Sequence, residues 1–138
     1  MTPSGLTILP SSNGFETTLQ RLERKIAERS VPILARIDHA EGARIAGLSM
    51  PPATVLIFGD ARVGTPLMQA SPTIAIDLPL KILVWNDAAG QTLVGYNDPV
   101  WLVERHGGLG ALNDNLARIG ALLSDLARTA AGRDKASD

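Results

Sequence analysis

The residues of this sequence that could take part in chemistry are few. Its two histidines, His39 and His106, are the only side chains that titrate near neutral pH. A histidine oriented by a carboxylate can act as a general base, and the candidate partners of His39 are Asp38, next to it, and Asp98. The sequence has no pair of histidines at the short spacing of a metalloprotease, so we predict no metal site. The structural alternative is a packed His39 in the first turn of a helix and a surface His106 near a helix end.

A second candidate is the segment GDARVGTP at 59–66. It has the two-glycine spacing of a phosphate-binding P-loop but lacks the lysine that reaches the phosphates, so it is not a nucleotide triphosphatase loop. We expect Thr65 to cap a helix that begins at Pro66. Free amides at such a helix start, with Gly64 and Arg62 beside them, favour a small anion. The alternative is a capped turn whose glycines supply positive φ angles.

Two further polar residues complete the candidate set. Lys81 lies among apolar neighbours and is either an inward-facing ligand anchor or one half of an exposed charge pair with Asp77. Tyr96 lies on the next expected strand. The sequence contains neither the GxSxG motif of serine hydrolases nor the GxGxxG motif of dinucleotide-binding proteins. The candidate ligand-binding residues are Asp38, His39, Arg62, Gly64, Thr65, Lys81, Tyr96 and His106.

Composition excludes several classes of protein. The 138 residues are 45% hydrophobic and 20% charged, which is typical of one globular domain. With 13 basic and 14 acidic residues the net charge is −1, so we do not expect nucleic acid as a partner. The chain has no cysteine, which excludes disulfides and thiol chemistry. No signal peptide or membrane-length apolar segment is present, so we expect a soluble, cytoplasmic protein without a cofactor.

The apolar pattern predicts an α+β fold in one domain, residues 1–138. Strands are expected at 5–10, 31–37, 53–58, 78–85 and 91–96, and we expect 31–37 to be buried on both sides. An apolar stripe from Phe15 to Ile26, with Asn13 at the capping position, predicts a long helix. Asp38, Thr65 and Asp98 each introduce a short helix, and Gly47 and Gly107 end two of them. The last helix follows the leucine stripe 109–126, and the tail 129–138 is expected to be frayed.

The sequence also resembles a known family. The segments DHAEGARIAGL, ATVLIFGDARVGTPLM, DLPLKILVW and GYNDPVWLVERHG are similar to the domain of unknown function 302 family. The resemblance implies a β-α-β-β-β-β-α antiparallel sheet with helices packed on one face, on the plan of TATA-binding-protein-like folds. It also implies homodimers or larger homo-oligomers. This chain departs from the family at Asp60, Ala61 and Arg62, where members commonly have Asn-Pro-Lys. Likeness of fold does not carry DNA binding with it.

Three functional hypotheses follow. The first is a module that binds a small anionic or polar metabolite near the helix starts at Asp38-His39 and Gly64-Thr65. The second is a homo-oligomeric structural or assembly protein without a catalytic site. The third is a hydrolase-like enzyme with His39 as general base. No recognised catalytic motif is present, so whether the protein is an enzyme is left open.

Overall fold

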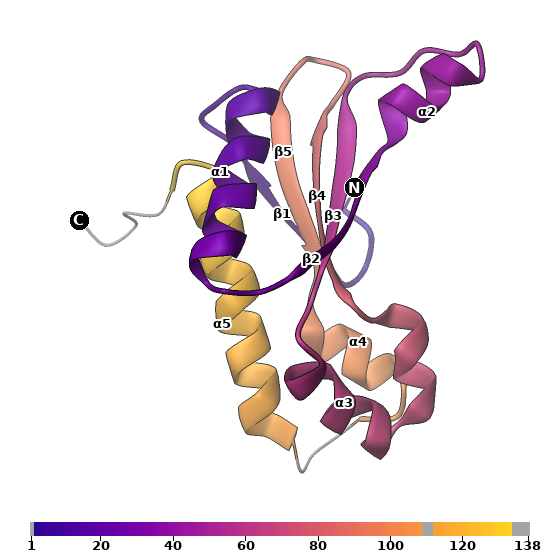
Figure 1. Cartoon of the computed structure of the whole chain (residues 1–138), viewed down its shortest axis with the longest axis vertical. Coiled ribbons are helices and arrows are strands. Elements are labelled where there is room, and N and C mark those ends of the chain that lie inside the picture. The colour runs from indigo at the N-terminus through magenta and orange to yellow at the C-terminus, as the bar shows by residue number, and fades with distance from the viewer. Residues whose placement is uncertain (1, 109–111, 134–138) are drawn as a thin grey trace.

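Five strands form one antiparallel sheet in the computed structural model, which describes residues 2–108 and 112–133. The sheet order is β1-β5-β4-β3-β2, so β1 and β2 form its edges. The fold is therefore single-domain α+β, as the sequence predicts (Figure 1). The strands are β1 Leu6–Pro10, β2 Ile33–Asp38, β3 Ala53–Phe58, β4 Leu80–Asn86 and β5 Thr92–Asn97.

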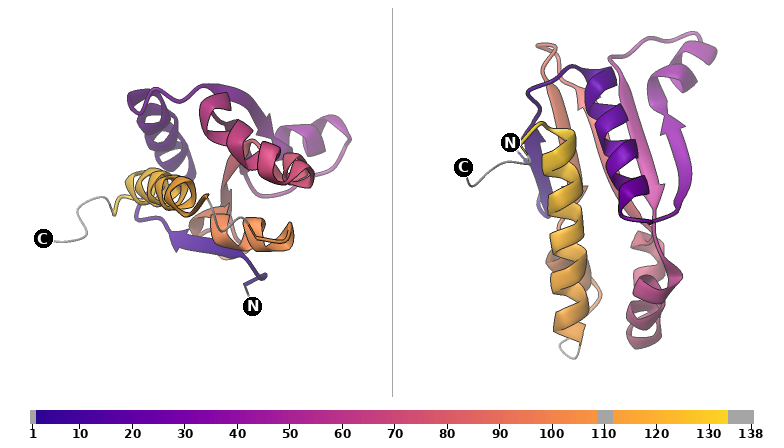
Figure 2. Two further views of the ribbon diagram at one scale, coloured as in Figure 1. Left: turned by 90° about the horizontal axis from the view of Figure 1, so that it is seen from below. Right: turned by 60° about the vertical axis from the view of Figure 1, so that its left-hand side comes forward.

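The helices fall into three groups. The two long helices, α1 (Phe15–Glu28) and α5 (Asn113–Ala130), lie side by side against one face of the sheet (Figures 1 and 2). At one end of the strands lie α3 (Ala61–Ala70), the 3-10 helix η1 (Pro72–Asp77) and α4 (Pro99–Arg105). At the opposite end, α2 (His39–Ile45) projects from the body. None of the described helices is long and apolar enough to cross a membrane.

The core lies between the sheet and the two long helices. On β3 the side chains alternate, so Thr54, Leu56 and Phe58 are buried while the residues between them are partly exposed. Ile82 and Val84 continue this buried face on β4. The helices contribute the apolar stripes read from the sequence, and these stripes are buried: Leu19, Leu22 and Ile26 from α1, and Ile119, Leu123 and Leu126 from α5.

The prediction that strand 31–37 is buried on both sides is wrong. β2 is an edge strand that pairs only with β3, and a register shift occurs between Ile33 and Ala35. Ile33, Leu34 and Ile37 are 41%, 58% and 41% exposed. A continuous apolar run is typical of a central strand. The run alone cannot show which strands will lie beside it.

The predicted start of the helix at Thr65-Pro66 is also wrong. The carboxylate of Asp60 accepts a hydrogen bond from the backbone N–H of Arg62 at 2.9 Å, so α3 begins at Ala61. Thr65 and Pro66 therefore lie inside the helix. Proline has no N–H to donate to the preceding turn, which makes it a better helix start than a helix interior residue. The Asp60 cap outweighs that preference.

Two predictions are wrong where the start of α1 meets the end of α5: the cap at Asn13 and the frayed tail that begins at residue 129. Gly14, not Asn13, is the N-cap of α1, and no side chain caps it. The backbone N–H of Ser12 instead donates to the carbonyl of Ala131, and Ala130 and Ala131 are fully buried. The part of the predicted frayed tail at Ala130 and Ala131 is thus packed beside the segment that precedes α1. Leu109 and the tail residues 134–138 lie outside the described residues.

Three predicted helix boundaries are confirmed. Asp38 caps α2 by accepting from the N–H of Glu41 at 2.9 Å. Gly47, with φ +81, ends that helix. Asp98 caps α4 by accepting from the N–H of Val100 at 3.0 Å. Each of these signals is local, so the sequence alone could show it.

Candidate functional site

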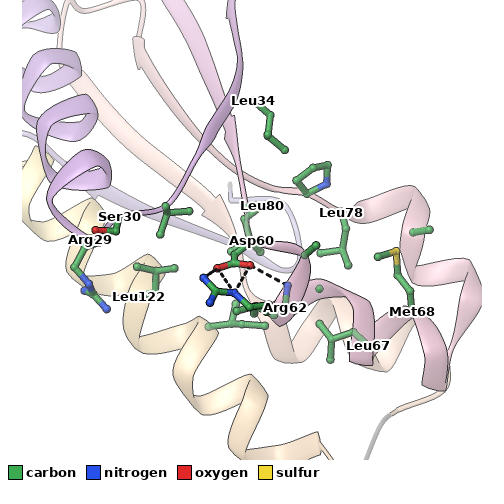
Figure 3. Close-up of a pocket in the computed structure, with 18 residues that line it drawn as sticks. Arg29, Ser30, Leu34, Asp60, Arg62, Leu67, Met68, Leu78, Leu80 and Leu122 are labelled. Carbon is green, nitrogen blue, oxygen red and sulfur yellow. Dashed lines mark hydrogen bonds and ion pairs between the residues drawn. The ribbon is translucent and has the colours of Figure 1, made fainter.

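A cavity of about 530 Å³ opens at the end of the sheet where β3 and β4 meet α3. Most of its lining is aliphatic. Figure 3 shows Leu34, Leu67, Met68, Leu78, Leu80 and Leu122 around it. The lining comes from β2, α3, η1, β4 and α5 and from the segments that join α1 to β2, β3 to α3 and η1 to β4. A cavity of this size and character is suited to a small apolar molecule.

Close packing of the backbone defines one wall of this cavity. Gly59 follows β3 directly, and a side chain placed on it would come within 3.3 Å of Pro79 Cβ. The absence of a side chain at Gly59 therefore lets the chain turn into α3 beside Pro79. Gly64 lies one turn into α3 and faces Leu78. Its small size widens the cavity at that point.

Two arginines mark the rim of the cavity. Arg62 Nη2 lies 2.8 Å from Asp60 Oδ2, and the guanidinium beside it lowers the pKa of the Asp60 carboxyl (Figure 3). The same contact raises the pKa of Arg62, whose side chain is 89% exposed. Arg29 Nη1 lies 2.5 Å from Asp125 Oδ2 on α5. Both pairs are open to water and contribute little to stability, so the arginines can reorient toward another anion.

A polar cluster lies beside the cavity, between η1 and α4. His106 Nε2 is 2.6 Å from Asp77 Oδ2, and Thr73 Oγ1 is 2.8 Å from His106 Nδ1. Arg105 Nη1 donates to both carboxylate oxygens of Asp77, at 2.9 and 2.8 Å. The side chain of His106 is only 7% exposed and that of Asp77 16%. The cluster is therefore a defined, largely enclosed contact rather than a loose surface pair.

The ionised carboxylate of Asp77 favours a proton on the His106 nitrogen that faces it. Burial acts to raise the pKa of Asp77, but the hydrogen bonds from His106 and Arg105 outweigh it, so the pKa is lowered. With Asp77 ionised, His106 Nε2 must donate its proton to the carboxylate. When the imidazole is neutral, the other nitrogen, Nδ1, is an acceptor, and the Thr73 hydroxyl donates to it.

Lys81 contacts the backbone that runs from the polar cluster to the wall of the cavity. Its Nζ donates to the carbonyl of Pro79 at 2.9 Å and lies 3.4 Å from the carbonyl of Asp77. The chain between those carbonyls supplies Leu78 and Pro79 to the cavity wall. The lysine is thus a brace for the backbone that turns from η1 into β4. The predicted charge pair of Lys81 with the Asp77 carboxylate is not formed; Asp77 pairs with His106 and Arg105 instead.

The eight predicted ligand-binding residues do not meet in one place. Arg62 and Gly64 line the cavity, and Lys81 and His106 lie in or beside the polar cluster. Asp38 pairs in register with Thr54, near the start of β3, while the cavity begins after Phe58 at its other end. Five residues of strand separate them by roughly 17 Å. His39 is exposed there, Tyr96 lies on β5, and Thr65 is inside α3.

Asp77 and Thr73 were not among the predicted site residues. Each is a common residue type in an ordinary context, and their partners His106 and Arg105 lie 28 to 33 positions further along the chain. No pattern in the neighbouring sequence predicts such a contact. Among residues 2–108 and 112–133, no three His, Asp or Glu side chains gather to hold a metal ion.

The fold places this protein among α+β proteins that have already been seen experimentally. It is similar to the crystal structure of an uncharacterized conserved DUF302 protein from Bacillus stearothermophilus, with a TM-score of 0.80 over 93% of this chain and 99% of that one. Sequence identity is 21%, so this likeness shows the fold. The family itself is established by sequence, because the model described as "Domain of unknown function DUF302" matches residues 8–126. The chain belongs to that family.

The chain is also similar in sequence to proteins that are named as fluoride-specific ion channels. The chain is 40% identical over 103 residues to the fluoride-specific ion channel FluC 1 of Brucella suis biovar 1 and to FluC 2 of Brucella melitensis biotype 1. The match covers 75% of this chain but only 41% and 38% of those proteins. The chain thus spans about two fifths of the relatives' length.

Proposed function

We propose that this protein binds a small amphipathic acid, with its apolar part in the cavity between β3, β4 and α3 and its acidic group at the rim. The observation that carries the proposal is the cavity itself, about 530 Å³ with a mostly aliphatic lining. Removing an apolar ligand from water is favourable in proportion to the area covered. The lining therefore supplies the affinity, and the rim supplies orientation.

The rim favours a negative group. Arg29 and Arg62 lie there, each held by a carboxylate at the surface of the protein. A ligand carboxylate can replace Asp60 as the partner of Arg62 in the same two-pronged geometry. This keeps the anionic ligand expected from the sequence but moves its binding site away from Asp38 and His39. The fluoride named in the channel relatives is a poor match to an aliphatic cavity, because it is small and strongly hydrated.

A binding assay with a matched pair of variants tests the cavity. Ala75 lines the cavity and is exposed, and its neighbour Ile76 is 75% exposed and does not line it. We expect Ala75→Phe to fill the cavity and to weaken binding of a medium-chain fatty acid, measured by displacement of a fluorescent naphthalene sulfonate. Ile76→Phe should bind as the wild type does. Equal affinity of the two variants and the wild type would exclude this cavity as the binding site.

A second pair of variants tests the acidic group. Arg62 and Arg44 are both exposed and each is hydrogen-bonded to a neighbouring carboxylate, but only Arg62 lies at the cavity. Arg62→Ala should weaken binding of the fatty acid and leave binding of the corresponding alcohol unchanged. Arg44→Ala should alter neither. If the acid and the alcohol respond alike to Arg62→Ala, the rim does not recognise charge.

We propose self-association as a second function, because the exposed apolar side chains concentrate in one region. These residues belong to β2, α2 and the segment after it: Ile33, Leu34, Ile37, Ile45, Leu48 and Met50, which are 41% to 73% exposed. Edge strands with unpaired backbone groups and exposed apolar patches are typical of interfaces. Two copies of β2 can pair antiparallel about a twofold axis, which uses the same surface on both partners.

Sedimentation velocity at micromolar concentration tests this association. We expect the wild type to sediment as a dimer or larger oligomer. Ile45→Lys should shift it toward the monomer, while Ile76→Lys, at a site of similar exposure on η1, should not. A wild-type protein that sediments as a monomer would contradict the proposal.

A further inference from the structure

The cluster of Thr73, His106 and Asp77 has the parts of an activated nucleophile: a hydroxyl, an imidazole and a carboxylate in one hydrogen-bonded line. We propose that it makes the Thr73 hydroxyl a nucleophile toward small activated esters, with His106 as the general base and Asp77 as the positioning residue. The proposal concerns acyl transfer and is independent of ligand binding in the cavity.

The proton arrangement supports this role. In the neutral imidazole, Asp77 holds the proton on His106 Nε2, and the Nδ1 lone pair is then directed at Thr73 Oγ1, 2.8 Å away. A nucleophile within hydrogen-bond distance of a base, with the base oriented by a third group, is the geometry that nucleophilic catalysis requires. In a Ser-His-Asp triad the carboxylate faces Nδ1 and the hydroxyl faces Nε2. Here the carboxylate faces Nε2 and the hydroxyl faces Nδ1, but the proton again passes from the hydroxyl to the imidazole.

The base and the carboxylate are largely buried, whereas the nucleophile is exposed, and catalysis needs both conditions. The imidazole is 7% exposed and the carboxylate 16%, so both are held in place. Thr73 is exposed, so an ester can approach its hydroxyl from solvent. The same contact gives the buried Nδ1 of His106 a hydrogen-bond partner, while the hydroxyl itself stays accessible to water and to a substrate.

Attachment of η1 to α4 does not require Thr73. Ser71 Oγ donates to the backbone carbonyl of His106 at 3.1 Å, and Arg105 binds Asp77 with two hydrogen bonds. These contacts already join the two elements. Ser71 thus provides a matched control, because it contacts the same histidine through its backbone and takes no part in the line of proton transfer.

The reaction is balanced without a cofactor. Thr73 passes its hydroxyl proton to His106 Nδ1 while its oxygen bonds to the ester carbonyl carbon. The alcohol then leaves and takes that proton, so an acyl-Thr73 ester remains. Water attacks this ester in the same way, with His106 again accepting and returning the proton. The products are the alcohol, the carboxylic acid and free Thr73.

Hydrolysis of p-nitrophenyl acetate by the full chain tests the proposal, with peptide mapping to find the acetyl group. We expect acetyl on Thr73 in the wild type, an unchanged rate in Ser71→Ala, and a loss of about 100-fold in Thr73→Val, which removes the hydroxyl on which the general base His106 acts. Thr73→Ser keeps a hydroxyl and should still be acetylated at position 73. Asp77→Asn should lower kcat and leave KM unchanged, because Asp77 acts only through His106.

Three outcomes would overturn the proposal. These are an unchanged rate in Thr73→Val, acetyl found on lysines alone, or a loss in Ser71→Ala equal to that in Thr73→Val. Circular dichroism establishes whether each variant is folded. If Thr73→Val does not fold, the acetylation site decides: acetyl at position 73 in the wild type and in Thr73→Ser supports the proposal, and acetyl found only elsewhere overturns it.

Discussion

Removal of the Asp77 carboxylate is expected to destabilise the protein by about 2 kcal/mol near neutral pH. The hydrogen bond with His106 is short, 2.6 Å, and mostly enclosed. A bond to a charged group contributes about 1.5–3 kcal/mol, and the low end applies because Asp77 keeps some contact with water. Arg105 is 51% exposed, so its pair adds less than about 1 kcal/mol.

The assay is thermal or urea unfolding of Asp77→Ala against the wild type. For a domain of this size, 2 kcal/mol corresponds to a decrease in Tm of roughly 6–8 °C. Asp98→Asn is the control, because asparagine caps a helix about as well as aspartate and should change stability by less than about 0.5 kcal/mol. A decrease of Tm in Asp77→Ala no larger than in this control would refute the reasoning.

The pH dependence of the same comparison identifies the charge as the cause. The pKa of Asp77 is lower in the folded protein than its ordinary value, so folding favours the ionised form. The stabilisation is fully present above the unfolded pKa, about 3.9, and is lost as the pH falls through the folded pKa. The difference between wild type and Asp77→Ala should therefore be largest near neutral pH and should shrink in acid. A difference that stays constant in acid would assign the effect to packing.

Three further predictions concern stability. Gly5→Ala should lower the free energy of unfolding by about 2–4 kcal/mol, because φ is +78 and the added methyl would lie 2.2 Å from the Trp101 ring. The control Gly90→Ala, with φ +84 and open space around it, should lower it by only about 1–2 kcal/mol. Equal losses of the two variants in urea unfolding would argue against the clash with Trp101. Phe58→Ala should cost about 3–5 kcal/mol because Phe58 is fully buried, and a loss under 1 kcal/mol would contradict the described core. Asp38→Ala should cost about 0.5–2 kcal/mol through loss of the α2 cap, with the loss of protection from hydrogen exchange confined to α2, and a global loss of protection would contradict this.

Local signals in the sequence determined much of the fold. Alternation and apolar runs placed all five strands, and the stripes of α1 and α5 were read correctly as the helical half of the core. Caps such as Asp38 and Asp98 were predictable because donor and acceptor are only two or three residues apart. Where two local signals competed, as at Asp60 and Pro66, the sequence did not show which would set the helix start.

Only the tertiary structure decided which polar residues meet. His106 was recognised as a candidate, but its partners Asp77 and Thr73 lie 29 and 33 positions away and are brought to it by the packing of η1 against α4. The same is true of the apolar cavity, whose lining comes from elements far apart in the chain. Contacts of this kind depend on the order of strands in the sheet, and that order also left β2 exposed at an edge. Periodicity within one segment holds no information about its neighbours in space.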